Sequence, residues 1–251
     1  MITSKNNQQI KGIKQLLGSL KERKDTGLFV IEGLRLVREA PAELIEKIFI
    51  SESLEKAGTG CIPGNYDSET VSDDVFKSMS DTVHPQGMLA VCRQPAYDMD
   101  EMSGAALYLL LDDIRDPGNM GTMIRTAEAA GASVIMGCGC VDVFNPKVIR
   151  STMGSIFRVP FTVCDMKEAV RRLKEEGVTV CAAALDGSVP YRKAHYGQAN
   201  AVIIGNEANG VSPEVQEMAD IRVRIPMKGR VESLNAAVSA AVLLYSLTEF
   251  E

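Results

Sequence analysis

The sequence is poor in several residue types, and each scarcity argues against a class of protein. It contains no tryptophan, two histidines (His84 and His195) and six cysteines, among which no CxxC pair occurs. A zinc site takes its ligands mainly from cysteine and histidine, so candidates are few and we expect no bound metal. Most of the cysteines lie in apolar, strand-like segments, which favours buried and reduced thiols.

Long apolar runs and phosphate-binding motifs are also missing. No run reaches the roughly 18 apolar residues of a membrane-spanning helix, and the polar N-terminal segment lacks the apolar core of a signal peptide. No GxGxxG follows a strand and no GxxxxGK[ST] occurs, which weakens a dinucleotide- or ATP-dependent reading. We therefore expect a cytoplasmic protein without membrane attachment.

Net charge is −6, which argues against a uniformly basic nucleic-acid-binding protein. The first 24 residues are nevertheless basic, with a single acidic residue, Glu22. Such a segment is typical either of a solvated helix face or of an arm that contacts RNA phosphates. The basic residues concerned are Lys5, Lys11, Lys14, Lys21, Arg23 and Lys24.

Residues 1–93 predict a small alternating α/β domain. A first helix is expected from Asn6 or Asn7 to about Glu22, with strands near 28–31, 45–50 and 87–92. Residues 94–104 are polar, carry a proline and show no periodicity, so they are predicted to form a linker. Residues 105–251 form the second predicted domain.

The second domain alternates more clearly between strands and helices. Six apolar segments at 107–111, 133–136, 159–163, 178–183, 201–204 and 221–225 are predicted strands, and most are separated by helical patterns. A long amphipathic helix is expected at 233–247. Repeated βα units of this kind predict a mainly parallel sheet with helices on both faces.

The segment that follows the strand at 107–111 contains a candidate functional residue. A polar hinge is expected at 112–120, followed by a helix from about Thr122 to Ala130. Arg125 would then lie in the first turn, where the helix dipole disfavours a cation. A residue that violates a local preference is a candidate functional residue.

Three loops rich in glycine and polar residues follow strands of the second domain, at 115–121, 205–210 and 226–235. The carboxyl ends of parallel strands share one edge of the sheet, so these loops are expected to build a ligand site. Glu207 lies between two glycines, and Asn235 is expected in the first turn of the last helix. No Ser-His-Asp arrangement fits, because both histidines lie outside the loops.

The same loops resemble a known family. NMGTMIRTAEAAG, AVIIGNEANGVS and IPMKGRVESLNAAVSAAVLLY resemble the three motifs of the SpoU (TrmH-like) RNA ribose 2′-O-methyltransferases of the SPOUT class, in family order and spacing. FNPKVIRSTMGSIFRVP resembles the family's connecting helix. FVIEGLRLVREA and HPQGMLAV resemble its small substrate-binding domain, and this second match is weaker.

The resemblance implies properties that periodicity does not show. The second domain would contain a deep trefoil knot and form a homodimer, the first would be L30e-like, and S-adenosylmethionine would be the cofactor. Cofactor-binding positions would be Gly205, Ile225 and Leu234, with Leu185, Asn206 and Met227 beside them. The catalytic set carried over from the family is Arg125, Asn119, Glu207, Ser233 and Asn235.

The reaction implied is methylation of a ribose 2′-hydroxyl, and by analogy a separate N-terminal domain of this kind suggests ribosomal more than transfer RNA as the substrate. Arg125 matches the proposed base of the family, but a guanidinium is hardly ever deprotonated in proteins. A role in binding phosphate or stabilising the developing alkoxide is therefore preferred, and a depressed pKa beside the helix N-terminus leaves the base role open. The alternatives are the same reaction on transfer RNA and a non-catalytic RNA-binding or ribosome-assembly protein.

Overall fold

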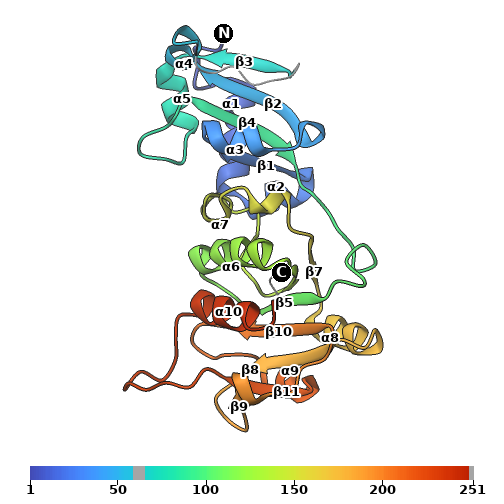
Figure 1. Ribbon diagram of the computed structural model, residues 1–251. Helices are drawn as coiled ribbons and strands as arrows, with labels where there is room; N and C mark the ends of the chain where they lie inside the picture. The colour runs from blue at the N-terminus through green and yellow to red at the C-terminus, as the bar shows by residue number, and fades with distance from the viewer. Residues whose placement is uncertain (59–65, 249–251) are drawn as a thin grey trace. The chain divides into compact units, whose positions relative to one another are not determined.

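A computed structural model describes residues 1–58 and 66–248 of the protein, and the chain divides into two compact units (Figure 1). Unit 1 comprises Met1–Pro95 and Asp142–Phe157, and unit 2 comprises Ala96–Val141 and Arg158–Glu251. The predicted second domain, 105–251, does not coincide with unit 2, because the segment 142–157 belongs to unit 1. That segment packs with the rest of unit 1 through its aromatic side chains and two ion pairs, described below.

Within the described residues, unit 2 contains a seven-stranded sheet in which all paired neighbours are parallel, as the βα pattern predicted. The central strands are apolar on both sides because helices cover both faces. In the order in which they pair, the strands are β7 (Phe161–Cys164), β6 (Ser133–Gly137), β5 (Leu107–Asp112), β10 (Asn200–Gly205), β8 (Thr179–Ala183), β11 (Ile221–Arg224) and β9 (Val189–Pro190).

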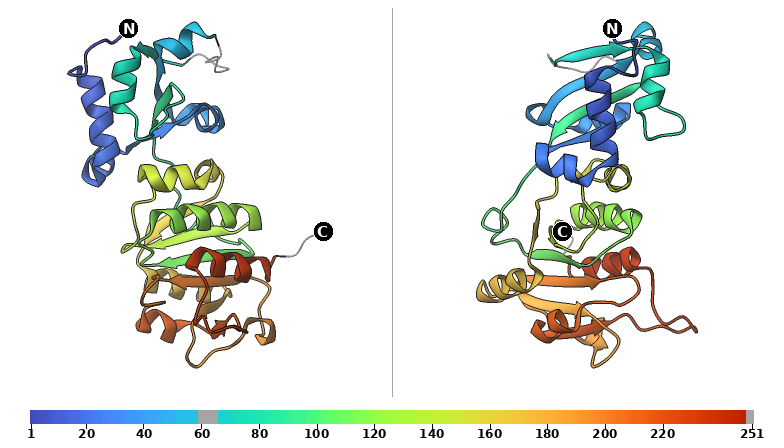
Figure 2. Two further views of the ribbon diagram at one scale, coloured as in Figure 1. Left: turned by 90° about the vertical axis from the view of Figure 1, so that its left-hand side faces the viewer. Right: turned by 180° about the vertical axis from the view of Figure 1, so that it is seen from behind.

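Two pairs of helices sandwich this sheet. Helices α8 (Met166–Glu175) and α9 (Pro213–Met218) pack on the face that carries Tyr108 and Ile203. Helices α6 (Pro117–Ala130) and α10 (Ala236–Tyr245) pack together on the opposite face, as the right-hand view of Figure 2 shows. The sheet is therefore closed to ligands on both faces, and its carboxyl edge remains for a site.

Unit 1 is built on a mixed sheet that is four-stranded in the described residues. Helices α1 (Gln8–Gly18) and α5 (Asp73–Met79) lie side by side on one face, in the left-hand view of Figure 2. Helix α3 (Leu34–Glu39) also packs on β1 and β4, and α7 (Pro146–Thr152) packs on β1. The strands pair in the order β1 (Leu28–Glu32), β4 (Met88–Arg93), β2 (Ile45–Ser51) and β3 (Ser68–Val71), and the remaining helices are α2 (Leu20–Thr26) and α4 (Glu52–Lys56).

Successive side chains of β1 lie on opposite faces of this sheet. Val30 joins Ile10 and Leu16 of α1 in one buried cluster. Phe29, its neighbour, points the other way because side chains alternate along a strand, and its ring lies 4.8 Å from that of Phe144. The segment 142–157 therefore covers the face of the sheet opposite α1.

Two predicted helices begin or end elsewhere. Helix α6 begins at Pro117, five residues before the expected start, because Asp116 caps it and proline is favoured in a first helical turn. Residues 117–120 are therefore helical and not part of a hinge. The first predicted helix is broken at Ser19, which has extended backbone and caps α2.

The predicted linker is also more structured than expected. Gln94 donates hydrogen bonds to the carbonyls of Arg23 and Leu28 in unit 1. Met102 is buried in the core of unit 2, where its carbonyl accepts a hydrogen bond of 2.8 Å from the hydroxyl of Tyr108. Residues 94–104 are consequently anchored at both ends, which composition could not indicate.

No helix in the described part of the chain is long and apolar enough to cross a membrane.

Candidate active site

The chain turns sharply where β5 ends. Asp113 has a φ of 59°, a left-handed conformation that aspartate tolerates better than most residues. Asn206, from the loop after β10, donates to the carbonyl of Asp113 at 2.9 Å and to its carboxylate at 3.2 Å. Arg115 forms an ion pair of 2.6 Å with the same carboxylate. The first two loops are thus joined at the carboxyl edge of the sheet.

A chain of hydrogen bonds connects the three loops predicted to build the site. Asn119, in the first turn of α6, donates through its side-chain amide to Glu207 at 3.0 Å. The carbonyl oxygen of the same side chain accepts from the amide of Asn235 at 3.0 Å. Each residue comes from a different loop, so the structure brings together three of the five predicted catalytic residues.

Asn235 has a second task that fixes its position. It is the N-cap of α10, and its side-chain oxygen accepts from the backbone amides of Ala237 and Val238 at 2.9 and 3.3 Å. It precedes the first turn in which it was expected. Because the cap holds the oxygen in place, the amide nitrogen is directed to Asn119, and α10 is held to α6 at this end.

Glu207 is held as a carboxylate. It accepts hydrogen bonds from the backbone amides of Arg115 and Asp116, both at 3.3 Å, in addition to the one from Asn119. Partial burial opposes the charge, but these hydrogen bonds together outweigh it and keep the pKa of Glu207 below its ordinary value. At neutral pH this residue therefore acts as an acceptor and not as an acid.

Gly205 has a steric reason to lack a side chain. A Cβ atom there would lie 2.1 Å from the backbone of Gly210 and Val211, because the loop folds back into a bridge between Asn206 and Gly210. Asn206 further accepts from the amides of Ala208 and Asn209. These contacts make Gly205 necessary for closing the loop, whatever else its backbone binds.

Arg125 and Ser233 stand outside this network. Both side chains belong to exposed residues, and neither forms a hydrogen bond or ion pair within the described part of the chain. Arg125 lies beyond the first turn of α6, because the helix begins at Pro117. The expectation that Arg125 lies in the first turn of this helix was therefore wrong. Asn119 and Glu207 bind each other, and neither forms a hydrogen bond with Arg125.

The predicted cofactor-binding positions lie on loops that follow three neighbouring strands, β8, β10 and β11. Leu185 is 59% exposed, although it is a large apolar residue, and Ile225, Met227 and Leu234 are half-buried. Apolar side chains left uncovered at a sheet edge beside glycine-containing backbone suit a ligand with a flat aromatic base. The residues present therefore fit S-adenosylmethionine.

The thiol of Cys140, near the end of β5, is not suited to act as a nucleophile. Cys140 donates to the carbonyl of Leu111, and burial raises the pKa of its thiol to about 11, so it stays protonated. No cluster of three or more potential metal ligands exists among the residues that the structure describes. Cys61 lies outside those residues.

The basic N-terminal residues divide into two groups. Arg23 is 3% exposed, forms an ion pair of 2.7 Å with Asp142 and donates to the carbonyls of Leu16 and Leu17. A buried, paired guanidinium cannot reach RNA, so the prediction for Arg23 was wrong. The five lysines, Lys5, Lys11, Lys14, Lys21 and Lys24, are all exposed.

Sequence reasoning missed two carboxylates that support the site. Asp112 accepts from the backbone amide of Ser212 at 2.7 Å, and Asp116 accepts from that of Asn119 at 2.7 Å. The Asp116-Pro117 pair was a readable signal, because aspartate at the cap and proline in the first turn are typical of a helix start. Asp112 gave no such signal.

This geometry defines a class: an α/β protein with a polar ligand site at the carboxyl edge of a parallel sheet, closed by a helix that returns to the sheet. The model of the SpoU rRNA Methylase family matches residues 106–245, and the chain belongs to this family. The model of the MRM3-like substrate binding domain matches residues 7–90. The resemblance seen in the motifs is thereby confirmed.

Three relatives show how far the similarity extends. The chain is 40% identical to the 23S rRNA (guanosine(2553)-2′-O)-methyltransferase RlmP of Bacillus subtilis, over 98% of each chain. An AdoMet-bound rRNA methyltransferase from Sinorhizobium meliloti has a TM-score of 0.88 and 31% identity, and covers 98% of this chain and 96% of its own. A TrmH/SpoU tRNA-modifying enzyme from A. aeolicus has a TM-score of 0.53 and 27% identity, and covers 59% of this chain and 76% of its own.

Proposed function

We propose that this protein transfers a methyl group from S-adenosylmethionine to a ribose 2′-hydroxyl of 23S ribosomal RNA. The observation that carries the proposal is the hydrogen-bonded chain Glu207–Asn119–Asn235, which joins the three family motifs into one site. A protein that kept the fold only to bind RNA would not need these three polar residues to converge. The cofactor, when bound, supplies an electrophilic methyl group on its sulfonium sulfur.

The residues of the chain then have separable tasks. The apolar side chains of Leu185, Ile225 and Leu234, with Met227, bind the adenosyl group together with the backbone at Gly205. Asn206 holds the loop after β10 against Asp113, which keeps that backbone in place. Glu207, Asn119 and Asn235 fix the mutual position of α6, α10 and the loop, so that hydroxyl oxygen and methyl carbon can be aligned.

Arg125 binds the phosphate next to the target ribose or stabilises the developing alkoxide. Its guanidinium is exposed and uncommitted within the described residues, so it is available to an anionic substrate. A guanidinium remains protonated, and we therefore assign it electrostatic stabilisation and leave removal of the proton to a neighbouring group or water. Ser233, exposed in the third loop, completes the substrate contacts.

Ribosomal RNA is preferred over transfer RNA because of unit 1. The two relatives whose names refer to rRNA match this chain over nearly its whole length. The tRNA-modifying enzyme covers only 59% of the chain. That share is close to the share of the chain matched by the methylase family at 106–245, and the chain carries the MRM3-like domain at 7–90 in addition. We assign recognition of the RNA to this domain, as an L30e-like fold, and contacts with phosphates to the five exposed lysines.

Helix α10 supports the further proposal of a homodimer through the second domain. It is apolar almost all round, and Val238 and Tyr245 remain exposed although the opposite side of the helix is buried. An apolar stripe of this kind is suited to a second copy of itself. Val238→Asp is expected to give a monomer in light scattering, whereas Ser239→Asp on the same helix leaves the mass unchanged.

We also propose the deep trefoil knot, because α10 follows β11 near one edge of the sheet and yet packs on α6 and β10. The proposal includes the cytoplasm as its location, where ribosomal RNA of bacteria is found. An experimental backbone trace through residues 200–245 tests the knot directly.

The experiment that tests the function is transfer of labelled methyl from S-adenosylmethionine to purified 23S, 16S and transfer RNA. Arg125→Ala is measured in parallel, with cofactor binding followed by calorimetry. Label in 23S RNA alone, lost in the variant while cofactor binding persists, is the expected result. Label in transfer RNA would reject the substrate, and cofactor binding without label in any RNA or ribosomal particle would reject the reaction.

A further inference from the structure

Unit 1 contains a cavity that the proposed reaction does not use. It has a volume of about 330 Å³ and lies between α3, residues 82–86 and the C-terminal end of α7. This volume is at the lower end of the range for small-molecule sites, roughly 300–1,000 Å³. Its walls include the side chains of Leu36, His84, Gln86, Arg150 and Met153.

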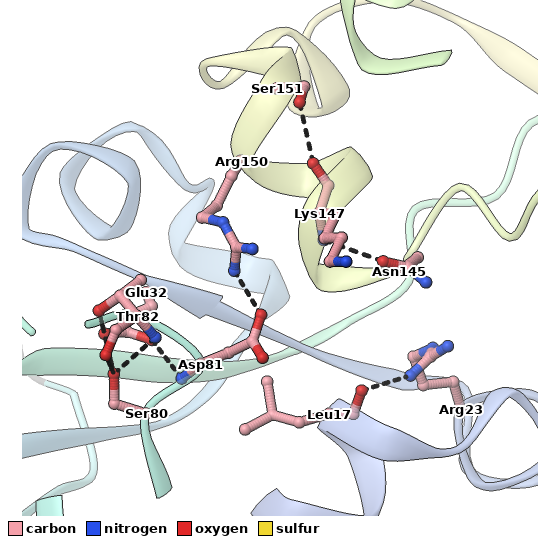
Figure 3. A network of polar contacts seen from close by, with 10 residues as sticks. All are labelled: Leu17, Arg23, Glu32, Ser80, Asp81, Thr82, Asn145, Lys147, Arg150 and Ser151. Carbon is pink, nitrogen blue, oxygen red and sulfur yellow. Dashed lines mark hydrogen bonds and ion pairs between the residues drawn. The ribbon is translucent and has the colours of Figure 1, made fainter. Parts of the chain in front are cut away.

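Hydrogen bonds hold the walls of the cavity in place (Figure 3). Glu32 accepts from the hydroxyls of Ser80 and Thr82 at 2.5 and 2.6 Å, and from the amide of Asp81 at 3.1 Å. Asp81 in turn forms an ion pair of 2.6 Å with Arg150 of α7. The loop and α7 are therefore joined before any ligand binds, and the cavity is preorganised.

The charged groups around the cavity are already paired. Arg35 bonds to Glu39 at 2.7 Å, Arg150 to Asp81, and the Glu32 carboxylate accepts three hydrogen bonds. A site for an isolated phosphate would instead leave cationic groups available to the anion. The cavity is better suited to an uncharged, polar ligand whose edges form hydrogen bonds.

Two side chains of the cavity, Gln86 and His84, are left for such a ligand. The side-chain oxygen of Gln86 accepts from the amide of Leu34 at 3.0 Å, which fixes the orientation of its amide group. Its nitrogen forms no hydrogen bond within residues 1–58 and 66–248. The imidazole of His84 is likewise uncommitted over the same residues and is exposed. A flat ring and a directed amide are the groups that recognise unstacked bases.

Met153 supplies an apolar wall at an energetic cost to the backbone. It caps α7 in the left-handed conformation, with a φ of 52°, where glycine is preferred. Its side chain is 43% exposed. A strained, exposed methionine at a cavity indicates a use for the side chain, because glycine would serve the helix end better.

We infer that this cavity binds one unpaired base of the RNA substrate, with Met153 and His84 against the ring and Gln86 on its edge. The inference rests on the proposed function for the identity of the RNA. It locates recognition on the sheet face covered by α7, whereas α1, which carries two of the five lysines, packs on the other face.

The first test detects the base directly. The protein contains 12 methionines, and methyl-labelled methionine gives one NMR signal for each, with that of Met153 identified by Met153→Leu. GMP, AMP, CMP and UMP are titrated in turn, with ribose 5-phosphate and inorganic phosphate as controls. At least one nucleotide is expected to shift the Met153 signal while both controls leave it unchanged. Equal shifts with ribose 5-phosphate or phosphate would identify an anion site and overturn the inference.

The second test measures affinity for protein-free 23S ribosomal RNA by filter binding. Met153→Ala and Gln86→Ala are each expected to weaken binding about 5- to 100-fold, the range for losing one stacked base. Val83→Ala is the matched control, because Val83 is 85% exposed in the same loop and does not line the cavity. Met153→Gly keeps the left-handed backbone without strain and is expected to bind as weakly as Met153→Ala.

Methyl transfer by the wild-type protein separates the two proposals. Normal transfer together with unchanged RNA affinity of Met153→Ala, Met153→Gly and Gln86→Ala overturns the inference and leaves the function standing. Absence of methyl transfer by the wild type rejects the proposed function. If the NMR signal of Met153 then shifts with free nucleotide while the three variants bind RNA as tightly as the wild type, the cavity binds a free nucleotide. If Met153→Gly binds RNA as tightly as the wild type while Met153→Ala binds weakly, the backbone conformation at this position matters and the methionine side chain does not. That result also contradicts the inference.

Discussion

The catalytic edge of unit 2 and the cavity of unit 1 are both polar sites, but they are built in different ways. At the edge, Asn119, Glu207 and Asn235 come from glycine-rich loops after parallel strands, and each loop is readable in the sequence. The cavity combines α3, a loop before β4 and Met153 from a segment far along the chain. A site for methyl transfer requires particular residues at particular positions, whereas a cavity that binds a base can be lined by side chains from segments without a motif.

The two sites also differ in what holds them. At the edge, Asn119, Glu207 and Asn235 are fixed by helix caps and backbone amides, which short motifs supply. The cavity depends on long-range contacts, among them Arg23–Asp142 and Arg150–Asp81. Substitutions at the edge should therefore impair chemistry with little loss of stability, and substitutions behind the cavity should do the reverse. The following predictions test that contrast, from the largest expected effect to the smallest.

Arg125→Ala is expected to reduce methyl transfer about 10²- to 10³-fold, as the loss of one donor to a developing charge typically does. Because Arg125 is exposed and forms no bond within the described residues, the melting temperature should stay unchanged. Single-turnover rates and thermal melts measure the two effects. Arg171→Ala, an exposed arginine of α8, is the matched control, and an equal loss in both variants would contradict the assignment.

Asp142→Ala is expected to destabilise the protein by about 3–5 kcal/mol, because it leaves the guanidinium of Arg23 buried and unpaired. Urea denaturation gives the change in free energy of unfolding. Arg23→Met with Asp142→Leu should recover much of the loss, since both charges are then removed. A stability loss under 1 kcal/mol for Asp142→Ala would show that the segment 142–157 is held mainly by its aromatic contacts.

Asn119→Ala should lower the rate of transfer at least tenfold, because it separates Glu207 from Asn235. Thr126→Ala, on the same helix, removes only a local bond to the Thr122 carbonyl and is the control. Combining Asn119→Ala with Glu207→Gln should cost little more than either change alone. Fully additive effects would mean that the two residues act independently.

Replacing the five exposed lysines by glutamine should reduce the salt dependence of RNA binding. Each phosphate contact that is lost lowers the slope of log affinity against log salt by about 0.7–0.9. Binding to 23S RNA fragments at several salt concentrations measures the slope. A slope equal to that of the wild type would show that these lysines are only solvated surface residues. The sheet face covered by α7 would then be the remaining candidate for RNA recognition.

The smallest effect concerns pH. Because the folded-state pKa of Glu207 is lowered, its contribution to stability is present above the unfolded value, near 4.5, and is lost as pH falls through the lower folded value. Wild type and Glu207→Gln should therefore differ in stability at neutral pH and converge in acid. A difference that grows below pH 4 would contradict the hydrogen-bonding scheme at this residue.

The sequence by itself determined the class of the second domain and supported a prediction of its catalytic residues. Alternation of apolar segments with helical patterns is a local property, so the parallel sheet followed from it. Glu207 and Asn235 were singled out because loops at one sheet edge must meet, and the resemblance to the family added Asn119. The start of α6 was missed although Asp116 and Pro117 marked it, since glycine at position 118 suggested a loop.

Only the tertiary structure decided what depends on contacts between distant residues. Arg23 looked like its lysine neighbours in the sequence, and its burial follows from an aspartate 119 positions away. The segment 142–157 had the pattern of its own half of the chain, yet Phe144 and Phe157 pack on Phe29. Such pairings leave no local pattern, because the free energy that selects them arises when both surfaces lose water together.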